Sequence, residues 1–230
     1  MESITPKLKR AFPILCACIA ALSFIQFLLF YIPNEFFYEN TALLYAASHI
    51  TTFFEALFSP IAAMIIFLAR GTGIKNKILP CSFVSILRFF YSVPYYYIYY
   101  VSDVFNSIEA ISLAIFVSFV FVLFFFLQTF VCILIMNYTK KGANKQKDNK
   151  KAASPFDLDD HINFGIVLSV IFIFVVFFIR ECINTVQYLT ENSGSYRTEE
   201  IITIVLSYLI IFAFSFVNYL IIISIKNKLI

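Results

Sequence analysis

The chain has 230 residues, of which 61% are hydrophobic and 13% are charged, and its formal net charge is only +3. A soluble domain is usually about 45–50% apolar and about 25% charged, so a soluble fold of this length has too little core for so much apolar surface. The composition therefore predicts one membrane domain over residues 1–230, whose excess apolar surface faces lipid.

Six apolar stretches are long enough to cross a bilayer as helices. A spanning helix needs roughly 20 mostly apolar residues, whereas spanning strands are segments of about ten residues that alternate between apolar and polar. The stretches in this chain are longer than such strands and continuously apolar. In chain order they lie at 11–32, 44–69, 78–101, 109–136, 162–179 and 201–225. We therefore expect an all-α fold, a polytopic transmembrane bundle of about six spans.

The positions of lysine and arginine predict how these spans are oriented. Basic residues concentrate in the N-terminal tail, in the loops after the second and fourth spans, and at the C-terminal end. The other three loops hold only Arg180 and Arg197. Because positively charged loops stay in the cytoplasm, the N-terminus and the C-terminus are both predicted to be cytoplasmic. We expect the cell (plasma) membrane as the location.

The longest connection, residues 137–160, follows the fourth span. Its first part is rich in lysine and asparagine, and it then becomes acidic at Asp157, Asp159 and Asp160. Such a composition is typical of a solvated, flexible cytoplasmic loop. One interpretation is that its lysines only set the topology, and another is that they attract anionic lipid, at about 1 kcal/mol per lysine near the surface.

The second and third predicted spans carry ionisable residues near mid-membrane. Glu55 lies in the second span and Arg88 in the third, and the short loop between them makes the two helices antiparallel neighbours. A lone charge at the bilayer centre costs at least about 2.5–3.5 kcal/mol, so pairing is the natural remedy. Small polar residues share the helix faces of these two charges: Ser48, Thr52 and Ser59 with Glu55, and Ser85 and Ser92 with Arg88.

The predicted Glu55–Arg88 pair allows two interpretations. An intramembrane ionisable pair is by default a hypothesis for a functional site. The alternative is a structural pin that orders the helical hairpin. No other mid-membrane charge extends a pathway from the pair. Gln128 and Asn218 are the other strongly polar side chains well inside a span.

Motifs for catalysis, metals or cofactors are absent from the sequence. There is no HExxH, no phosphate-binding GxxxxGK[ST] and no GxSxG motif. His49 and His161 are predicted on opposite sides of the membrane. The cysteines are typical of small buried hydrophobic residues, although Cys16, Cys18, Cys81 and Cys132 near one membrane face also suggest a metal site or acylation. We expect no cofactor and no bound metal. An integral membrane enzyme is the third alternative, after a transporter and a scaffold, because no catalytic set is visible in the sequence.

These observations favour a small transporter or a transport-associated membrane component. The alternative is a non-catalytic subunit or scaffold of a larger membrane complex. The expected partners are the lipid bilayer, anionic lipid at 137–160 and other membrane subunits, with no nucleic acid. A transporter should have a cavity that reaches Glu55 and Arg88, whereas a scaffold should keep the pair dry.

The predicted topology can be tested with reporters fused to the chain. A reporter after Lys145 or after Ile230 should give a cytoplasmic signal, and one after Glu39, Val104 or Ser193 an external signal. Reporter activity in intact and permeabilised cells measures both. A cytoplasmic signal from the Glu39 fusion would contradict the whole scheme.

Overall fold

The computed structural model describes residues 6–31, 56–69, 74–102, 107–149, 158–191 and 198–229. Apart from a bend at Ile74, these residues are helical, which confirms the all-α prediction. The helices are α1 (Pro6–Tyr31), α4 (Lys75–Ser102), α5 (Ser107–Asn149), α6 (Leu158–Glu191) and α7 (Thr198–Leu229). A further helix, Ala56–Ala69, precedes α4 and is called the short helix.

Three of these helices contain a segment long and apolar enough to cross a membrane. The segments are Ile108–Lys140 of α5, His161–Gln187 of α6 and Ile204–Leu229 of α7. Large apolar side chains such as Phe116 and Phe119 of α5 and Phe212 and Phe216 of α7 are more than half exposed. Soluble monomers rarely expose so large an apolar surface, so these faces suit contact with lipid. The chain is accordingly described as an integral membrane protein.

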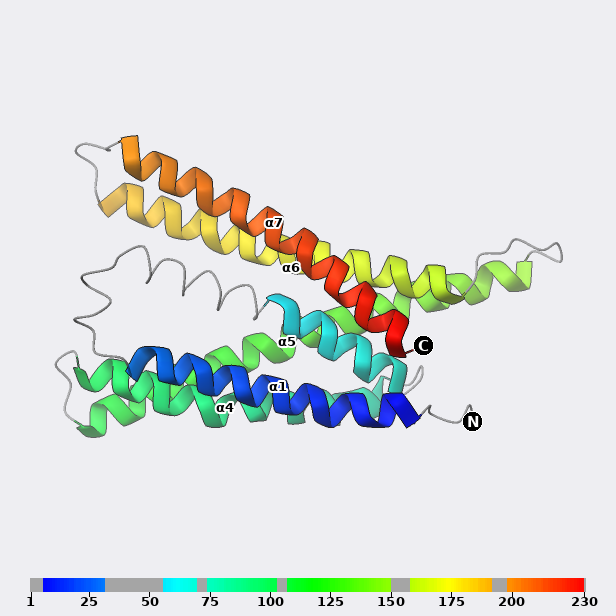
Figure 1. The fold of residues 1–230 in the computed structure, drawn as a ribbon, viewed down its shortest axis with the longest axis horizontal. Helices are drawn as coiled ribbons and strands as arrows, with labels where there is room; N and C mark the ends of the chain where they lie inside the picture. Colours follow the sequence, from blue (N-terminus) through cyan, green and yellow to red (C-terminus); the bar gives the residue numbers. More distant parts are fainter. Residues whose placement is uncertain are drawn as a thin grey trace.

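The helices pack as two groups around the short helix. α4 packs against α1 and α5, and α6 packs against α5 and α7. Figure 1 shows α1 and α4 running in the same direction, whereas α5, α6 and α7 each run opposite to the helix before, so that α1 begins and α7 ends on the same side of the molecule. The α6–α7 hairpin diverges from α1 and α4 toward the other side, and the short helix (cyan) lies between the two groups.

The short helix forms the centre of the core. Ala62, Ala63, Met64 and Ile66 have no exposed surface. A helix that is apolar on all sides must be buried on all sides, which explains its central place. Pro60 removes one backbone hydrogen bond, yet the helix continues through it, as neighbouring helices in a membrane protein allow.

Several helices extend beyond the predicted spans. α5 continues to Asn149, well into the segment 137–160, so the connection before α6 is shorter than the sequence analysis predicts. The four lysines, Ala143 and Gln146 of this extension are good helix formers, whereas its three asparagines and Gly142 are not. α6 continues past residue 179 to Glu191, and Arg180 therefore lies in a helix and not in a loop. α4 corresponds closely to the predicted third span, and Pro94 does not interrupt this helix.

Gly165 is the place where α6 approaches α5 most tightly among the described glycines. A Cβ carbon at this position would lie 3.0 Å from Thr139 Oγ1 and 3.3 Å from Met136 Cγ. The Thr139 hydroxyl is buried and donates a hydrogen bond to the Met136 carbonyl oxygen at 3.0 Å, so it cannot turn away without losing that bond. The absence of a side chain at residue 165 therefore sets the α5–α6 distance.

Substitution of this glycine should destabilise the bundle. At an exposed helical site, Gly→Ala stabilises by about 1 kcal/mol. Gly165→Ala should instead lower the thermal unfolding temperature in detergent, because the new methyl group meets the Thr139 hydroxyl. The double variant with Thr139→Ala should recover most of the loss, with Thr139→Ala alone as the control. A higher unfolding temperature for Gly165→Ala would contradict the close approach.

Candidate functional site

The structure describes only some of the polar residues that the sequence predicts for the intramembrane site. Glu55, Ser48 and Thr52 lie outside the described residues, as does the side chain of Ser92. Ser59 is fully buried on the short helix, and its Oγ donates a hydrogen bond to Gln128 Oε1 of α5 at 3.2 Å. The face of the short helix that carries Ser59 therefore packs against α5.

Ser85 stays within its own helix. Its Oγ is buried and donates to the carbonyl oxygen of Cys81, one turn earlier, at 2.9 Å. The Cys81 thiol in turn lies 3.8 Å from the carbonyl oxygen of Phe126 on α5. The small polar face of α4 therefore packs closely against α5, as small and hydroxylated residues do between membrane helices.

Arg88 is half-buried and faces an aromatic ring of the neighbouring helix. Its guanidinium carbon lies 5.6 Å from the ring centroid of Phe125 on α5. A cation over an aromatic face gains about 0.5–1 kcal/mol when exposed and about 2 kcal/mol or more when desolvated. The ring therefore provides part of the stabilisation that Arg88 needs in an apolar environment.

Arg88 also lines a cleft, here called the arginine cleft, between α4, α5 and α6. The cleft holds about 300 Å³ of empty space, including its open mouth. Its second cation is Arg180 of α6, whose guanidinium carbon lies 6.0 Å from the Phe177 centroid. The remaining lining residues are aromatic or amide side chains: Phe121, Phe124, Phe125 and Gln128 of α5.

The chemistry of the arginine cleft favours a negatively charged group. Both guanidinium groups carry only hydrogen-bond donors. Gln128 adds an amide nitrogen, Nε2, that is buried without a hydrogen-bond partner among the described residues. No carboxylate is among the described residues that line the cleft. Carboxylate and phosphate oxygens are the acceptors that arginine binds most strongly.

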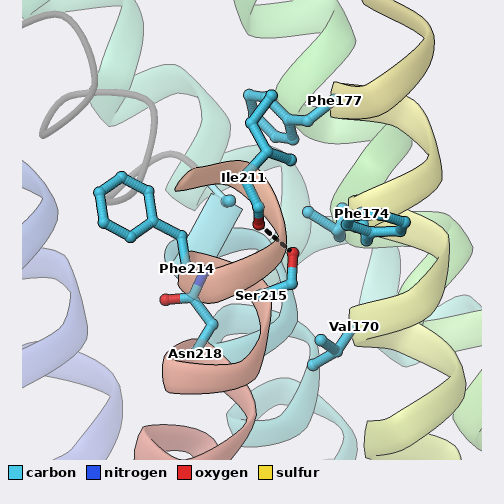
Figure 2. A pocket seen from close by; sticks show the side chains of 9 residues that line it. Val170, Phe174, Phe177, Ile211, Phe214, Ser215 and Asn218 are labelled. Atoms are coloured by element: carbon cyan, nitrogen blue, oxygen red, sulfur yellow. Dashed lines mark hydrogen bonds between the residues drawn. The ribbon is translucent and has the colours of Figure 1, made fainter. Parts of the chain in front are cut away.

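A second cleft, here called the apolar cleft, lies between α6, α7 and the start of the short helix (Figure 2). It holds about 370 Å³ of empty space, including its open mouth. Its lining is mostly aliphatic and aromatic: Ala56, Val170, Ile173, Phe174, Phe177, Ile211 and Phe214, with Ser215 and Asn218. The chemistry of this lining therefore favours an apolar group over a charged one.

Two polar side chains of α7 face this apolar lining. Figure 2 shows Ser215 between α6 and α7, where its Oγ donates to the carbonyl oxygen of Ile211 at 2.9 Å. Asn218 lies one turn further along α7 and is 3% exposed. Its Oδ1 atom is buried and has no hydrogen-bond partner among the described residues. The apolar cleft thus contains one buried polar group that could orient a ligand.

The two clefts adjoin at Phe177, which lines both of them. Along α6, Phe174 lies one turn before Phe177 in the apolar cleft, and Arg180 lies one turn after it in the arginine cleft. Residues three apart share one face of a helix. One face of α6 therefore changes from apolar to cationic within two turns, which matches an amphipathic molecule with an anionic head.

Arg180 was not predicted as a site residue, because the predicted fifth span ends at residue 179. The signal that could have found it is the continuing helical spacing after Arg180. Ile183 and Val186 keep apolar side chains three residues apart, and no Gly or Pro stops the helix before Glu191. A helix extended by this pattern would have placed Arg180 on α6, where its exposed side chain lines the mouth of the arginine cleft.

The cysteines take no part in either cleft. Cys81 and Cys132 are fully buried, whereas Cys18 is exposed. Over the described residues, no group of three His, Cys, Asp or Glu side chains is placed to hold a metal ion.

Comparisons with protein-family models, with curated protein sequences and with solved structures find no match to this chain. Its function is therefore inferred from its own residues and their geometry.

The pairing of Glu55 with Arg88 stays a prediction, because Glu55 lies outside the described residues. Removing one partner of a buried ion pair typically costs about 3–5 kcal/mol. Glu55→Gln and Arg88→Met should each lower the thermal stability in detergent, and the double variant should recover much of the loss. Strictly additive losses would refute the pairing, because independent sites add.

Proposed function

We propose that this chain is a six-span transporter of the cell membrane that carries amphipathic organic anions, with both chain ends in the cytoplasm. The observation that carries the proposal is the arginine cleft, in which Arg88 and Arg180 reach one space beside aromatic rings. Charged side chains within membrane helices are costly, and they commonly mark substrate pathways. Arg180 adds a cation beyond the predicted Glu55–Arg88 pair, and this additional positive charge makes an anion the natural substrate.

The adjoining apolar cleft supports an amphipathic substrate over a small inorganic anion. An anionic head in the arginine cleft places its alkyl chain next to Phe177 and then against Phe174 and Ile211. Burying each CH₂ group of that chain gains about 0.8 kcal/mol when the chain leaves water. The head therefore provides selectivity, and the tail provides much of the affinity.

The arrangement of the helices supports movement of such a substrate. Both clefts border α6, and the α6–α7 hairpin diverges from α1 and α4 (Figure 1). Many transporters move one helical group against another around a binding site near the bilayer midplane. A tilt of the α6–α7 hairpin would open the shared wall of the clefts toward one membrane face or the other.

Binding of dodecanoate to the purified protein in lipid nanodiscs tests the proposal. Labelled dodecanoate should bind saturably, and dodecyltrimethylammonium of equal chain length should not displace it. Arg180→Gln should weaken binding about 10-fold to 100-fold, since a hydrogen bond to a charged group contributes about 1.5–3 kcal/mol. Arg180→Lys should keep part of the affinity, because it keeps the charge but not the planar fork.

The matched control is Arg10→Gln, which removes the same charge from an exposed residue of α1 that lines neither cleft. It should bind dodecanoate like the unchanged protein. Proteoliposomes should then take up dodecanoate faster with the unchanged protein than with Arg180→Gln. Equal binding of dodecanoate by Arg180→Gln and Arg10→Gln would refute the anion site. Binding without uptake would instead favour the alternative, a non-catalytic subunit of a larger membrane complex.

A further inference from the structure

Lys77 lies at the start of α4, outside the predicted third span, and has no exposed surface. Its ammonium nitrogen donates a hydrogen bond to Asn137 Oδ1 of α5 at 2.7 Å. The same nitrogen lies 4.3 Å from the ring centroid of Phe67, near the end of the short helix. A buried lysine is thus held by a neutral amide and an aromatic ring.

A second lysine shares the same ring. The ammonium nitrogen of Lys140 lies 5.6 Å from the Phe67 centroid, and Lys140 is half-buried, one turn after Asn137 on α5. Burial, and then repulsion from Lys140, lower the pKa of Lys77 from 10.5 to about 8. None of the described carboxylates acts on Lys77 to oppose these two effects. Buried charges are normally paired, so two cations without a described acid call for an anion.

Asn137 provides a third donor at this place. Its side chain is 6% exposed, and its Oδ1 accepts the hydrogen bond from Lys77. Its Nδ2 atom is buried and has no hydrogen-bond partner among the described residues. Leaving such a donor unpaired costs about 1–3 kcal/mol. The unpaired amide and the two ammonium groups lie together where the short helix, α4 and α5 meet.

We propose that Lys77, Lys140 and Asn137, here called the lysine cluster, bind a phosphate group beside the ring of Phe67. A phosphate has several acceptor oxygens, which suit donors from more than one direction, and lysine binds phosphate as a point charge. The group reaches the cluster from the side of Lys140, which is the less buried lysine. This site lies on other residues than the arginine cleft and does not depend on the transport proposal.

The phosphate can belong to a lipid headgroup or be free in the cytoplasm. Lysines next to membrane spans attract anionic headgroups of the cytoplasmic leaflet, and the lysine cluster lies at the ends of membrane helices. Phosphatidic acid and inorganic phosphate offer the same chemistry from the two sources. A comparison of the two as probes therefore identifies the source.

Thermal unfolding of the full chain in nanodiscs tests this site. Three conditions are compared: phosphatidylcholine alone, phosphatidylcholine with phosphatidic acid, and phosphatidylcholine with inorganic phosphate in solution. Near saturation, phosphatidic acid should raise the unfolding temperature of the unchanged protein by roughly 5 °C, because a ligand stabilises the state that binds it. An equal rise with inorganic phosphate would support the site and assign it to a free anion.

Two variants test whether the rise in unfolding temperature depends on the lysine cluster or only on the positive charge near the start of α4. Lys140→Gln should lose at least half of the rise caused by phosphatidic acid. Lys75→Gln is the matched control, since Lys75 is an exposed lysine of the same helix end, two residues before Lys77. It should keep the rise. Equal losses in Lys140→Gln and Lys75→Gln, or no rise above phosphatidylcholine alone, would overturn the proposal.

A second variant, Lys77→Met, tests the phosphate site at its other lysine. Lys77→Met keeps the apolar stem but removes the buried charge, so it should raise the unfolding temperature in phosphatidylcholine alone. The gain should be larger at pH 7 than at pH 10, because Lys77 is charged only below about pH 8. The same variant should respond less to phosphatidic acid. A full response by Lys77→Met would also contradict the site.

Discussion

Water is absent from the hydrocarbon core of a bilayer, so every backbone N–H and C=O group there must find its partner inside the protein. A helix meets this requirement within one segment, which is why a chain that is 61% hydrophobic appears as helices wherever it is described. The same constraint acts on side chains. The hydroxyl groups of Ser85, Ser169 and Ser215 each donate to the carbonyl oxygen one turn earlier. These three hydroxyl groups are therefore paired within the helix that carries them.

Cations pose a harder problem in the same environment, and this protein meets it largely with aromatic rings and amides. Phe125 faces Arg88, Phe177 faces Arg180, and Phe67 faces both Lys77 and Lys140. A ring or an amide stabilises a cation but does not neutralise it. Where no described carboxylate acts on the cation, as at Lys77, a positive potential remains. Such a potential attracts anions more strongly than the same charges on a wet surface.

Sequence patterns predicted the helices well because continuous apolar runs are local signals. They predicted the ends of helices less well, since the extensions of α5 and α6 consist of residues that suit both helix and loop. Sequence patterns did not predict which residues of different helices contact each other. The small polar face of Ser59 suggested contact with the third span, but the rotation of the short helix brings Ser59 to Gln128 of α5.

Burial of a basic residue at a helix start was equally hidden from the sequence. In the sequence, Lys77 is one of the basic residues of a predicted loop, where lysine usually extends its ammonium group into water. Its burial depends on Asn137 and Phe67, which come from two other helices. Likewise, the arginine cleft needs residues of α4, α5 and α6 together. Only the packed bundle brings such distant residues into one place.

The length of α5 has a practical consequence for imaging. Its 43 residues make a helix about 65 Å long, whereas a bilayer with its headgroups is about 40–45 Å thick. Even a tilted α5 therefore extends beyond the membrane, and the Lys-rich end at Asn149 extends together with the start of α6 (Figure 1). Small membrane proteins usually lack any feature outside the detergent micelle. This rod gives electron microscopy an intrinsic landmark for aligning particles and telling the two membrane faces apart.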